Sequence, residues 1–153
     1  MLTDIVDSTA TAARLGDATW HEILNSHDRI AWHTVDRHGG RVIKSTGDGM
    51  LVAFDTPSSA ADCATDLRCR LTEIGLHVRL GLHAGEVQQR DDGDIAGLAV
   101  HIAARVEQAA APGEILISAV VRELLLGSEH TTTDAGDRHL KGIEGQWRLF
   151  ALA

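Results

Sequence analysis

Two strand-like runs enclose a Gly-Asp-Gly tip, and this pattern restricts the fold more than any other feature of the chain. Arg41 to Ser45 and Met50 to Phe54 lie on either side of Thr46-Gly47-Asp48-Gly49. Glycine supplies the positive φ angles that a tight turn needs, so the pattern predicts a β-hairpin. The chain must therefore contain at least one antiparallel strand pair.

Helical periodicity appears on both sides of this hairpin. Apolar side chains recur at helical spacing from Ala18 to Arg37, and Gly39-Gly40 predicts the end of that helix. Pro57 suits the first turn of a second helix, and Ala99 to Ala110 predicts a third. The residues expected to face inward from the third helix are Val100, Ala103, Ala104 and Val106.

The remaining segments complete a mixed pattern of strands and helices. Ser8 and Asp17 are expected as helix N-caps, His77 to Ala84 alternates as a half-buried strand does, and Gln88 to Asp94 is polar enough to be a loop. Further elements are expected at Leu2 to Val6, Glu114 to Ser118, Ala119 to Leu126 and Trp147 to Leu152. The order is β-α-β-β-α-β followed by α-β-α and more strands. It predicts an α+β fold, a ferredoxin-like split β-α-β sandwich with a C-terminal α/β extension, in a single domain spanning 1–153.

Composition argues against several classes of partner. The formal net charge is −8 and the basic residues form no stripe, so a nucleic-acid partner is not expected. No apolar run approaches the ~18 residues that would cross a membrane, and no signal peptide is visible, so the default expectation is a cytoplasmic protein. Cys63 and Cys69 are expected to be two buried free thiols.

Asp4 and Asp48 are the residues that first indicate chemistry. Asp4 lies toward the end of the first predicted strand, and Val6 to Thr9 follow at or near a helix start whose free amides could face phosphate groups. Asp48 occupies the hairpin tip. Two carboxylates on rigid corners suit paired Mg²⁺ or Mn²⁺ ions on a polyphosphate. Taken one at a time, the same residues also fit an ordinary turn aspartate and a common Asp-Gly hairpin tip.

Four motifs together resemble the catalytic domain of class III nucleotidyl cyclases, in order, at the right spacing and over nearly the whole chain. The matching segments are Thr3 to Thr9, Lys44 to Gly49, Asp94 to Arg105 and Leu140 to Gly142. The stretch from Gly81 to Glu86 is similar in style to actinobacterial members of the family. The resemblance implies an adenylyl cyclase that converts ATP to 3′,5′-cyclic AMP and pyrophosphate in a homodimer with shared active sites.

The resemblance also implies roles at the phosphate end of the nucleotide. Asp4 and Asp48, helped by the Ile5 carbonyl, would hold two divalent ions, Mg²⁺ or Mn²⁺. Arg105 would stabilise the charge that builds on the α-phosphate. The other expected contacts to the substrate come from Val6, Asp7, Ser8, Thr9, Gly47 and Lys141.

The implied base-reading residues are Lys44 and Asp94. A lysine donates to adenine N1 and an aspartate accepts from the N6 amino group, whereas guanine presents the opposite pattern. Guanylyl cyclases typically carry Glu at the position of Lys44. His101 stands where the family usually has Asn, so an altered rate is expected. That departure also suggests an alternative, a nucleotide-binding regulatory module without strong turnover.

Two further points belong to this interpretation. Another two-metal nucleotidyl transferase is disfavoured, because no basic template groove is visible. The first strand, Leu2 to Val6, is shorter than the family resemblance leads us to expect, and its length could weaken folding or dimerisation.

Overall fold

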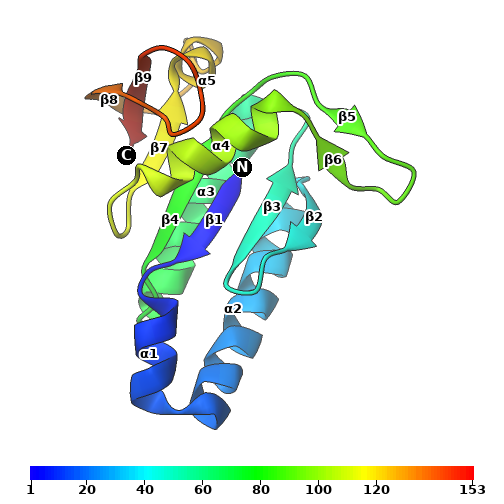
Figure 1. The fold of residues 1–153 in the computed structure, drawn as a ribbon, viewed down its shortest axis with the longest axis vertical. Coiled ribbons are helices and arrows are strands. Elements are labelled where there is room, and N and C mark those ends of the chain that lie inside the picture. The colour runs from blue at the N-terminus through cyan, green and yellow to red at the C-terminus, as the bar shows by residue number, and fades with distance from the viewer.

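The computed structural model describes residues 1–153 and confirms a mixed α+β fold. Its main sheet has seven strands in the order β2-β3-β1-β4-β7-β9-β8 (Figure 1). The strands are β1 (Leu2–Ile5), β2 (Arg41–Ser45), β3 (Gly49–Ala53), β4 (Val78–Leu82), β7 (Ile115–Ser118), β8 (Thr132–Arg138) and β9 (Trp147–Leu152). The helices are α1 (Ser8–Leu15), α2 (Asp17–Arg37), α3 (Pro57–Glu73), α4 (Leu98–Gln108) and α5 (Ala119–Leu124). No helix is both long and apolar enough to span a bilayer.

Strand β1 lies near the centre of this sheet and brings distant segments together. It pairs antiparallel with β3 on one side and with β4 on the other. In this register Asp4 lies opposite Gly49 of the hairpin and opposite Arg79 of β4. Because residues directly opposite each other point to the same face of a sheet, Asp4 and Arg79 share a face.

Both faces of the sheet are covered near its centre. One face packs against α2 and α3 in the larger apolar core, which includes Val35, Leu67 and Leu80. Helix α4 lies across the opposite face (Figure 1). A Cβ placed on Gly81 would come within 2.2 Å of the Glu107 backbone nitrogen, so α4 rests directly on β4.

This packing corrects two sequence expectations. Segment His77 to Ala84 is not a half-buried strand throughout, because α4 also buries Gly81 on its second face. The buried side of α4 consists of Ile102, Ala103, Val106 and Glu107, so Val100 and Ala104 are only partly buried. Apolar periodicity in the sequence could not identify the buried side of α4, because that side includes a glutamate.

Several local details also differ from the predictions. The N-caps of α1 and α2 are Asp7 and Gly16, one residue before Ser8 and Asp17. The expected loop over 88–94 begins with a short strand, β5 (Gln88–Gln89), which pairs with β6 (Ile95–Ala96). Strand β8 was not predicted individually, because its sequence is mostly polar. Both cysteines are free as predicted, but Cys69 is exposed.

Candidate active site

Asp4 and Asp48 lie together at the junction of β1 with the β2–β3 hairpin. The Ile5 amide donates a hydrogen bond of 3.0 Å to the Asp48 carbonyl, which ties the hairpin tip to the end of β1. Partial burial raises the pKa of Asp4, and the negative charge of Asp48 raises it further. The two negative charges repel each other, so the position favours a cation.

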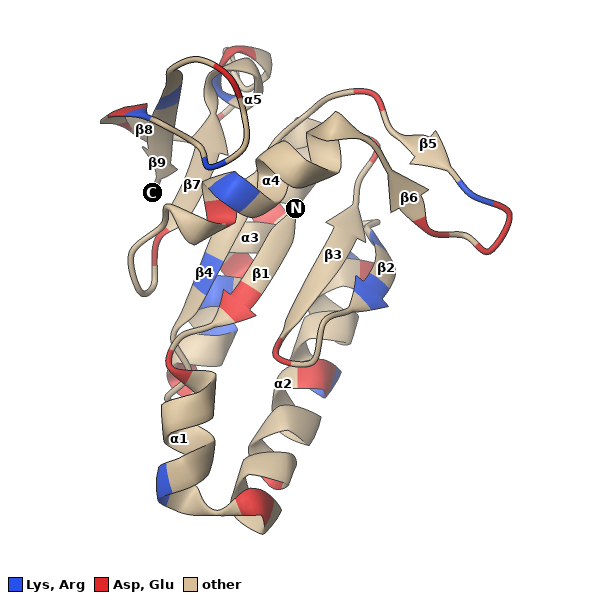
Figure 2. Ribbon diagram, in the orientation of Figure 1, with Lys and Arg blue, Asp and Glu red and all other residues tan.

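Arg79 supplies the positive charge nearest to this pair. Its Nη1 lies 3.5 Å from the Asp4 Oδ2 and lowers the pKa of Asp4, against the larger effect of burial. Figure 2 shows acidic positions on β1, on the β2–β3 turn and on α4, with basic positions on β4 close by. Sequence reasoning missed Arg79. The alternating pattern of the strand placed Arg79 on its polar side, but the sequence did not show that Arg79 pairs opposite Asp4.

Glu107 is a third carboxyl group in this region and was also missed. It projects from α4 toward β4 and is 6% exposed. Burial raises its pKa to about 7, and the charges of Asp4 and Asp48 add to the shift while Arg79 opposes it. We call Asp4, Ser8, Asp48, Arg79 and Glu107 the carboxylate cluster.

The turn between β1 and α1 closes one side of the carboxylate cluster. Asp7 has a left-handed backbone conformation, with φ of 53°, and α1 begins directly after it. The Val6 amide donates to the His77 carbonyl, so it is not free for a phosphate. The amides of Ser8 and Thr9 lie in the first turn of α1, where no helical acceptor exists. The Ser8 hydroxyl donates to the Asp48 Oδ2 at 2.5 Å.

Lys44 and Asp94 form a direct ion pair. Because the family resemblance implies that these two residues read the base, we call them the base-reading pair. The Lys44 Nζ lies 2.8 Å from the Asp94 Oδ2. This hydrogen bond is the main cause of a lowered pKa of Asp94. The short β5–β6 hairpin carries Asp94 to β2, and the Ile95 amide donates to its other oxygen at 2.8 Å. The sequence motifs predicted these two residues from positions 50 residues apart.

Among the remaining predicted residues, His101, Arg105 and Lys141 lie apart from the carboxylate cluster, whereas Gly47 directly precedes Asp48 in the chain. His101 is exposed on α4, and the Arg105 Nη1 donates to Gln108 Oε1 at 2.5 Å. At 100° per residue, His101 and Arg105 lie on the side of α4 away from Glu107. Lys141 is exposed in the β8–β9 loop, which is attached to α4 through Leu140 in the smaller apolar core. Gly47 donates to Ser45 Oγ at 3.4 Å.

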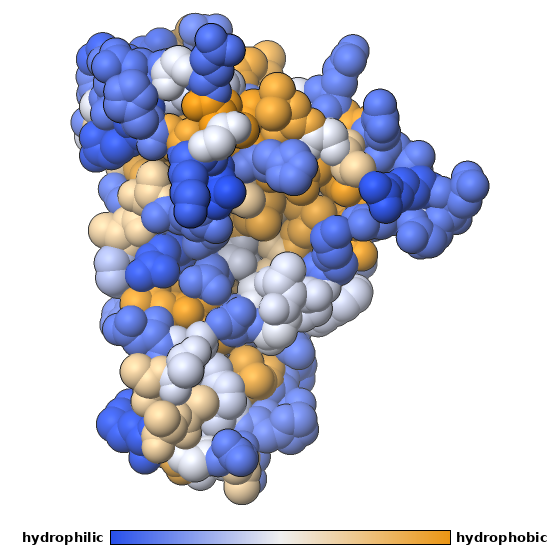
Figure 3. All heavy atoms as spheres, viewed as in Figure 1, coloured by the Kyte–Doolittle hydropathy of each residue, from blue (hydrophilic) through white to orange (hydrophobic).

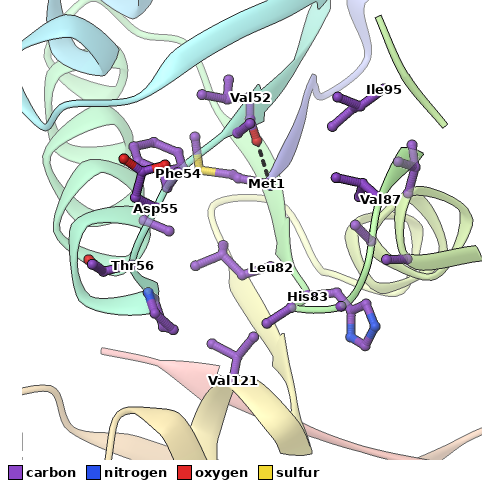
Figure 4. A pocket seen from close by; sticks show the side chains of 18 of the residues that line it. Met1, Val52, Phe54, Asp55, Thr56, Leu82, His83, Val87, Ile95 and Val121 are labelled. Atoms are coloured by element: carbon purple, nitrogen blue, oxygen red, sulfur yellow. Dashed lines mark hydrogen bonds between the residues drawn. The ribbon is translucent and has the colours of Figure 1, made fainter. Parts of the chain in front are cut away.

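A separate apolar hollow of about 350 Å³ lies beyond the far end of β3. Figure 4 shows it between Met1, Val52, Phe54, Leu82, His83, Val87, Ile95 and Val121. It includes neither Asp4 nor Asp48, and its lining is mostly hydrophobic. A polyphosphate would find no cation there, so the hollow is not the candidate site.

The donor set of the carboxylate cluster fits a hard divalent cation that also binds the substrate. Carboxylate oxygens are the ligands that Mg²⁺ and Mn²⁺ prefer, and Mg²⁺ sites commonly use one or two carboxylates with substrate phosphates. No group of three His, Cys, Asp or Glu side chains is arranged to hold a metal ion without other ligands. Phosphate and water oxygens would therefore complete the coordination.

Curated relatives match most of this chain but are much longer. A serine/threonine-protein kinase, pkn2 of Myxococcus xanthus, is 30% identical over 98% of the chain, which covers 19% of that protein. A putative adenylate cyclase 3 of Rhizobium meliloti is 32% identical over 83% of the chain and 22% of its own length. An uncharacterized protein of Mycobacterium tuberculosis is 33% identical over 97% of the chain and 39% of its own length. The chain thus spans well under half of each.

Solved structures show the same fold. An adenylate/guanylate cyclase/hydrolase from Silicibacter pomeroyi superposes with a TM-score of 0.85 at 28% identity, covering 98% of this chain and 92% of that one. An adenylate cyclase from Trypanosoma brucei gives a TM-score of 0.89 at 21% identity, covering 99% and 87%. A family model described as the adenylate and guanylate cyclase catalytic domain matches residues 1–153. The chain therefore belongs to the family of adenylate and guanylate cyclase catalytic domains.

Proposed function

We propose that the protein is an adenylyl cyclase, which converts ATP to 3′,5′-cyclic AMP and pyrophosphate. The observation that carries this choice of nucleotide is the 2.8 Å pair of Lys44 and Asp94. An ammonium group beside a carboxylate matches the N1 acceptor and the N6 donor of adenine. Guanine offers a donor at N1 and an acceptor at O6, so each protein group would face a partner of its own kind. Each unpaired polar group costs about 1–3 kcal/mol, which is enough to select the substrate.

Asp4 and Asp48, with the Ile5 carbonyl, would hold two divalent metal ions at the carboxylate cluster. When bound, these ions would supply activation of the ribose 3′-hydroxyl and neutralisation of the phosphate charge. The amides of Ser8 and Thr9 lie in the first turn of α1, where a helix N-terminus favours anions. Arg79, 3.5 Å from Asp4, is placed to contact phosphate oxygens beside the metals. Val6, Asp7 and Gly47 would shape this edge, and Lys141 would approach the polyphosphate from the β8–β9 loop.

The site would be shared between two copies of the chain. Within one copy, α4 turns Glu107 toward Asp4 and turns His101 and Arg105 away from it. A second copy related by a two-fold axis could present its own His101, Arg105, Lys44 and Asp94 to the carboxylate cluster of the first. Figure 3 shows apolar surface gathered between α4, β3 and the β5–β6 hairpin, where Leu98 and Val87 are 63% and 47% exposed. An apolar face of this kind supports an association surface.

In this arrangement the chain's residues orient the nucleotide for in-line attack. The base-reading pair would fix the adenine, and the carboxylate cluster would fix the triphosphate at the other end. Arg105 would donate to the α-phosphate oxygens as their charge increases. His101 would hydrogen-bond the ribose. Restricting both reacting atoms in this way accounts for rate acceleration without a protein nucleophile. The free thiols Cys63 and Cys69 are compatible with a cytoplasmic location, which is part of the proposal.

A product assay tests this function. The purified protein should be incubated with ATP or GTP, each with Mn²⁺ and with Mg²⁺, and the products should be separated by chromatography. We expect cyclic AMP and pyrophosphate from ATP, formed faster with Mn²⁺, and little cyclic GMP. Formation of ADP or AMP alone would contradict a cyclase.

One observation favours a second candidate, a nucleotide-binding regulatory module with weak turnover. His101 stands at the position where the family resemblance leads us to expect Asn, and its side chain is exposed. This candidate predicts ATP binding by calorimetry with no cyclic AMP in the product assay. Binding and turnover together would favour the enzyme.

A further inference from the structure

We propose that Ser8 is a positioning residue that orients the Asp48 carboxylate toward Asp4 for metal binding. The inference rests on the proposed metal-binding role of Asp4 and Asp48. The main evidence is the hydrogen bond that Ser8 Oγ donates to Asp48 Oδ2 at 2.5 Å. The bond joins residues 40 positions apart, one at the start of α1 and one on the β2–β3 turn.

The backbone around Ser8 is fixed from both sides, so its hydroxyl is presented in one place. The Val6 amide bonds to the His77 carbonyl at 2.9 Å, and the Thr11 amide bonds to the Asp7 carbonyl at 2.8 Å. Between them Asp7 is the one non-glycine residue with a positive φ. Such a conformation costs energy for a residue with a side chain and persists where the surroundings determine it. The left-handed corner turns the chain so that α1 starts beside Asp48.

Asp48 needs such support more than Asp4 does. Asp4 lies within β1, paired on both sides, whereas Asp48 lies outside the strands between Gly47 and Gly49. The negative charge of Asp48 raises the pKa of Asp4, so the two carboxylates repel each other. Without a donor, rotation of the Asp48 side chain away from Asp4 would relieve this repulsion. The Ser8 hydroxyl holds Oδ2 and leaves Oδ1 free.

The same hydrogen bond limits which group of Ser8 can bind the substrate. A serine hydroxyl has one proton to donate, and here it goes to Asp48. A phosphate at the start of α1 would therefore be met by the Ser8 amide rather than by its hydroxyl. Mutation of the side chain should then affect metal binding first and phosphate binding little.

The test compares Ser8→Ala with Ser8→Thr, which keeps a hydroxyl, and with Thr11→Ala as a matched control on α1. Thr11 lies on the same helix, about one turn after Ser8. Mn²⁺ binding is measured by electron paramagnetic resonance with 3′-deoxy-ATP, which lacks the attacking hydroxyl. Ser8→Ala should weaken Mn²⁺ binding about 10-fold, the lower end of what outer partners of metal ligands contribute. The Mn²⁺ concentration for half-maximal activity should rise by the same factor. Ser8→Thr should recover most of the loss, and Thr11→Ala should match wild type.

A double-mutant cycle separates this inference from the proposed function. If Ser8 acts through Asp48, adding Ser8→Ala to Asp48→Asn should weaken Mn²⁺ binding no further. Equal Mn²⁺ affinity for Ser8→Ala and wild type would overturn the positioning role, as would an undiminished effect in the Asp48→Asn background. If Asp48→Asn alone left Mn²⁺ binding unchanged, the metal role of Asp48 would fail instead. Should Ser8→Ala fold poorly by circular dichroism, Ser8→Cys, a weaker donor of similar size, provides the same comparison.

Discussion

The carboxylate cluster and the outer face of α4 would form opposite sides of one active site, yet the fold holds them very differently. Asp4 and Asp48 are tied to each other's strands by backbone bonds, and Ser8 and Arg79 contact their carboxylates. His101 is exposed, and Arg105 donates a hydrogen bond to its helix neighbour Gln108. The first region is built by the core of one chain. In the second region, a bound ligand or a second copy of the chain would have to fix the positions of the side chains.

The base-reading pair is intermediate between these two regions. Lys44 and Asp94 already contact each other, but their side chains are 48% and 27% exposed. Exposed ion pairs of this kind contribute little to stability, so the pair is not explained by folding. In the proposed cyclase, this alignment would cost side-chain entropy before the base binds and would preorganise the pair for it.

The largest effect is expected when the carboxylate cluster loses one of its proposed metal ligands. Asp4→Ala or Asp48→Ala should lower kcat at least ~100-fold, because each removes a major electrostatic element of the site. Steady-state rates at saturating Mn²⁺ measure this. Asp36→Ala, on the exposed side of α2, is the matched control and should retain wild-type turnover. Near-normal turnover of Asp48→Ala would remove that residue from the mechanism.

The next prediction asks whether the two halves come from different chains. Asp4→Ala and Arg105→Ala should each be nearly inactive alone. In a mixed dimer, one site carries both lesions and the other carries neither. With random exchange half of the dimers are mixed, so activity should return to about one quarter of wild type by two-fold symmetry.

This recovery also depends on association. Specific activity of wild type should rise with protein concentration until the dimer dominates. Subunit exchange should be verified with differently tagged chains. Verified exchange without recovered activity would place both residues in the same site of one chain.

A smaller effect is expected at the base-reading pair. Lys44→Glu combined with Asp94→Ser should shift the ratio of kcat/KM toward GTP by at least ~10-fold, because each mispaired group is worth 1 kcal/mol or more. Competition between ATP and GTP measures the ratio. Asp91→Ser removes an exposed carboxylate from the same hairpin region and should leave the ratio unchanged. An unchanged ratio in the double variant would contradict the base-reading roles.

The sequence predicted the parts of this site that depend on order and spacing along the chain. The hairpin with Asp48 at its tip follows from glycines between strand-like runs, and β2 and β3 lie where expected within a residue. Family motifs predicted that Lys44 and Asp94 act together, and they form an ion pair. Short-range patterns carry this information because turns and periodicity are local.

Contacts that depend on strand register or helix rotation were not predictable. Arg79 meets Asp4 only because β4 pairs with β1 in one register. Glu107 reaches the same place because Gly81 leaves no side chain between α4 and β4. Ser8 was predicted to cap α1, but the N-cap is the left-handed Asp7, one residue earlier. The Ser8 hydroxyl is therefore free to donate to Asp48. None of these follows from a single segment.

The smallest expected effect concerns Glu107, where α4 meets the carboxylate cluster. Its pKa in the fold is about 7, raised from 4.5 mainly by burial. Between these values the folded protein holds a proton that the unfolded chain releases, so stability falls as pH rises through this window. Glu107→Gln cannot ionise, so the variant lacks this loss.

We therefore expect Glu107→Gln to be more stable than wild type at pH 8 by about 1–2 kcal/mol, with the difference nearly gone at pH 4.5. One pKa unit corresponds to about 1.4 kcal/mol, and solvent near the carboxyl reduces the full value. Urea unfolding without divalent ions, at one protein concentration, measures both curves. Glu123→Gln, exposed on α5, should follow wild type at every pH. Parallel curves for Glu107→Gln and wild type would show that Glu107 ionises in the fold as freely as in the unfolded chain. The face of α4 toward β4 would then be hydrated, and the carboxylate cluster would be less enclosed than the packing of Glu107 on Gly81 indicates.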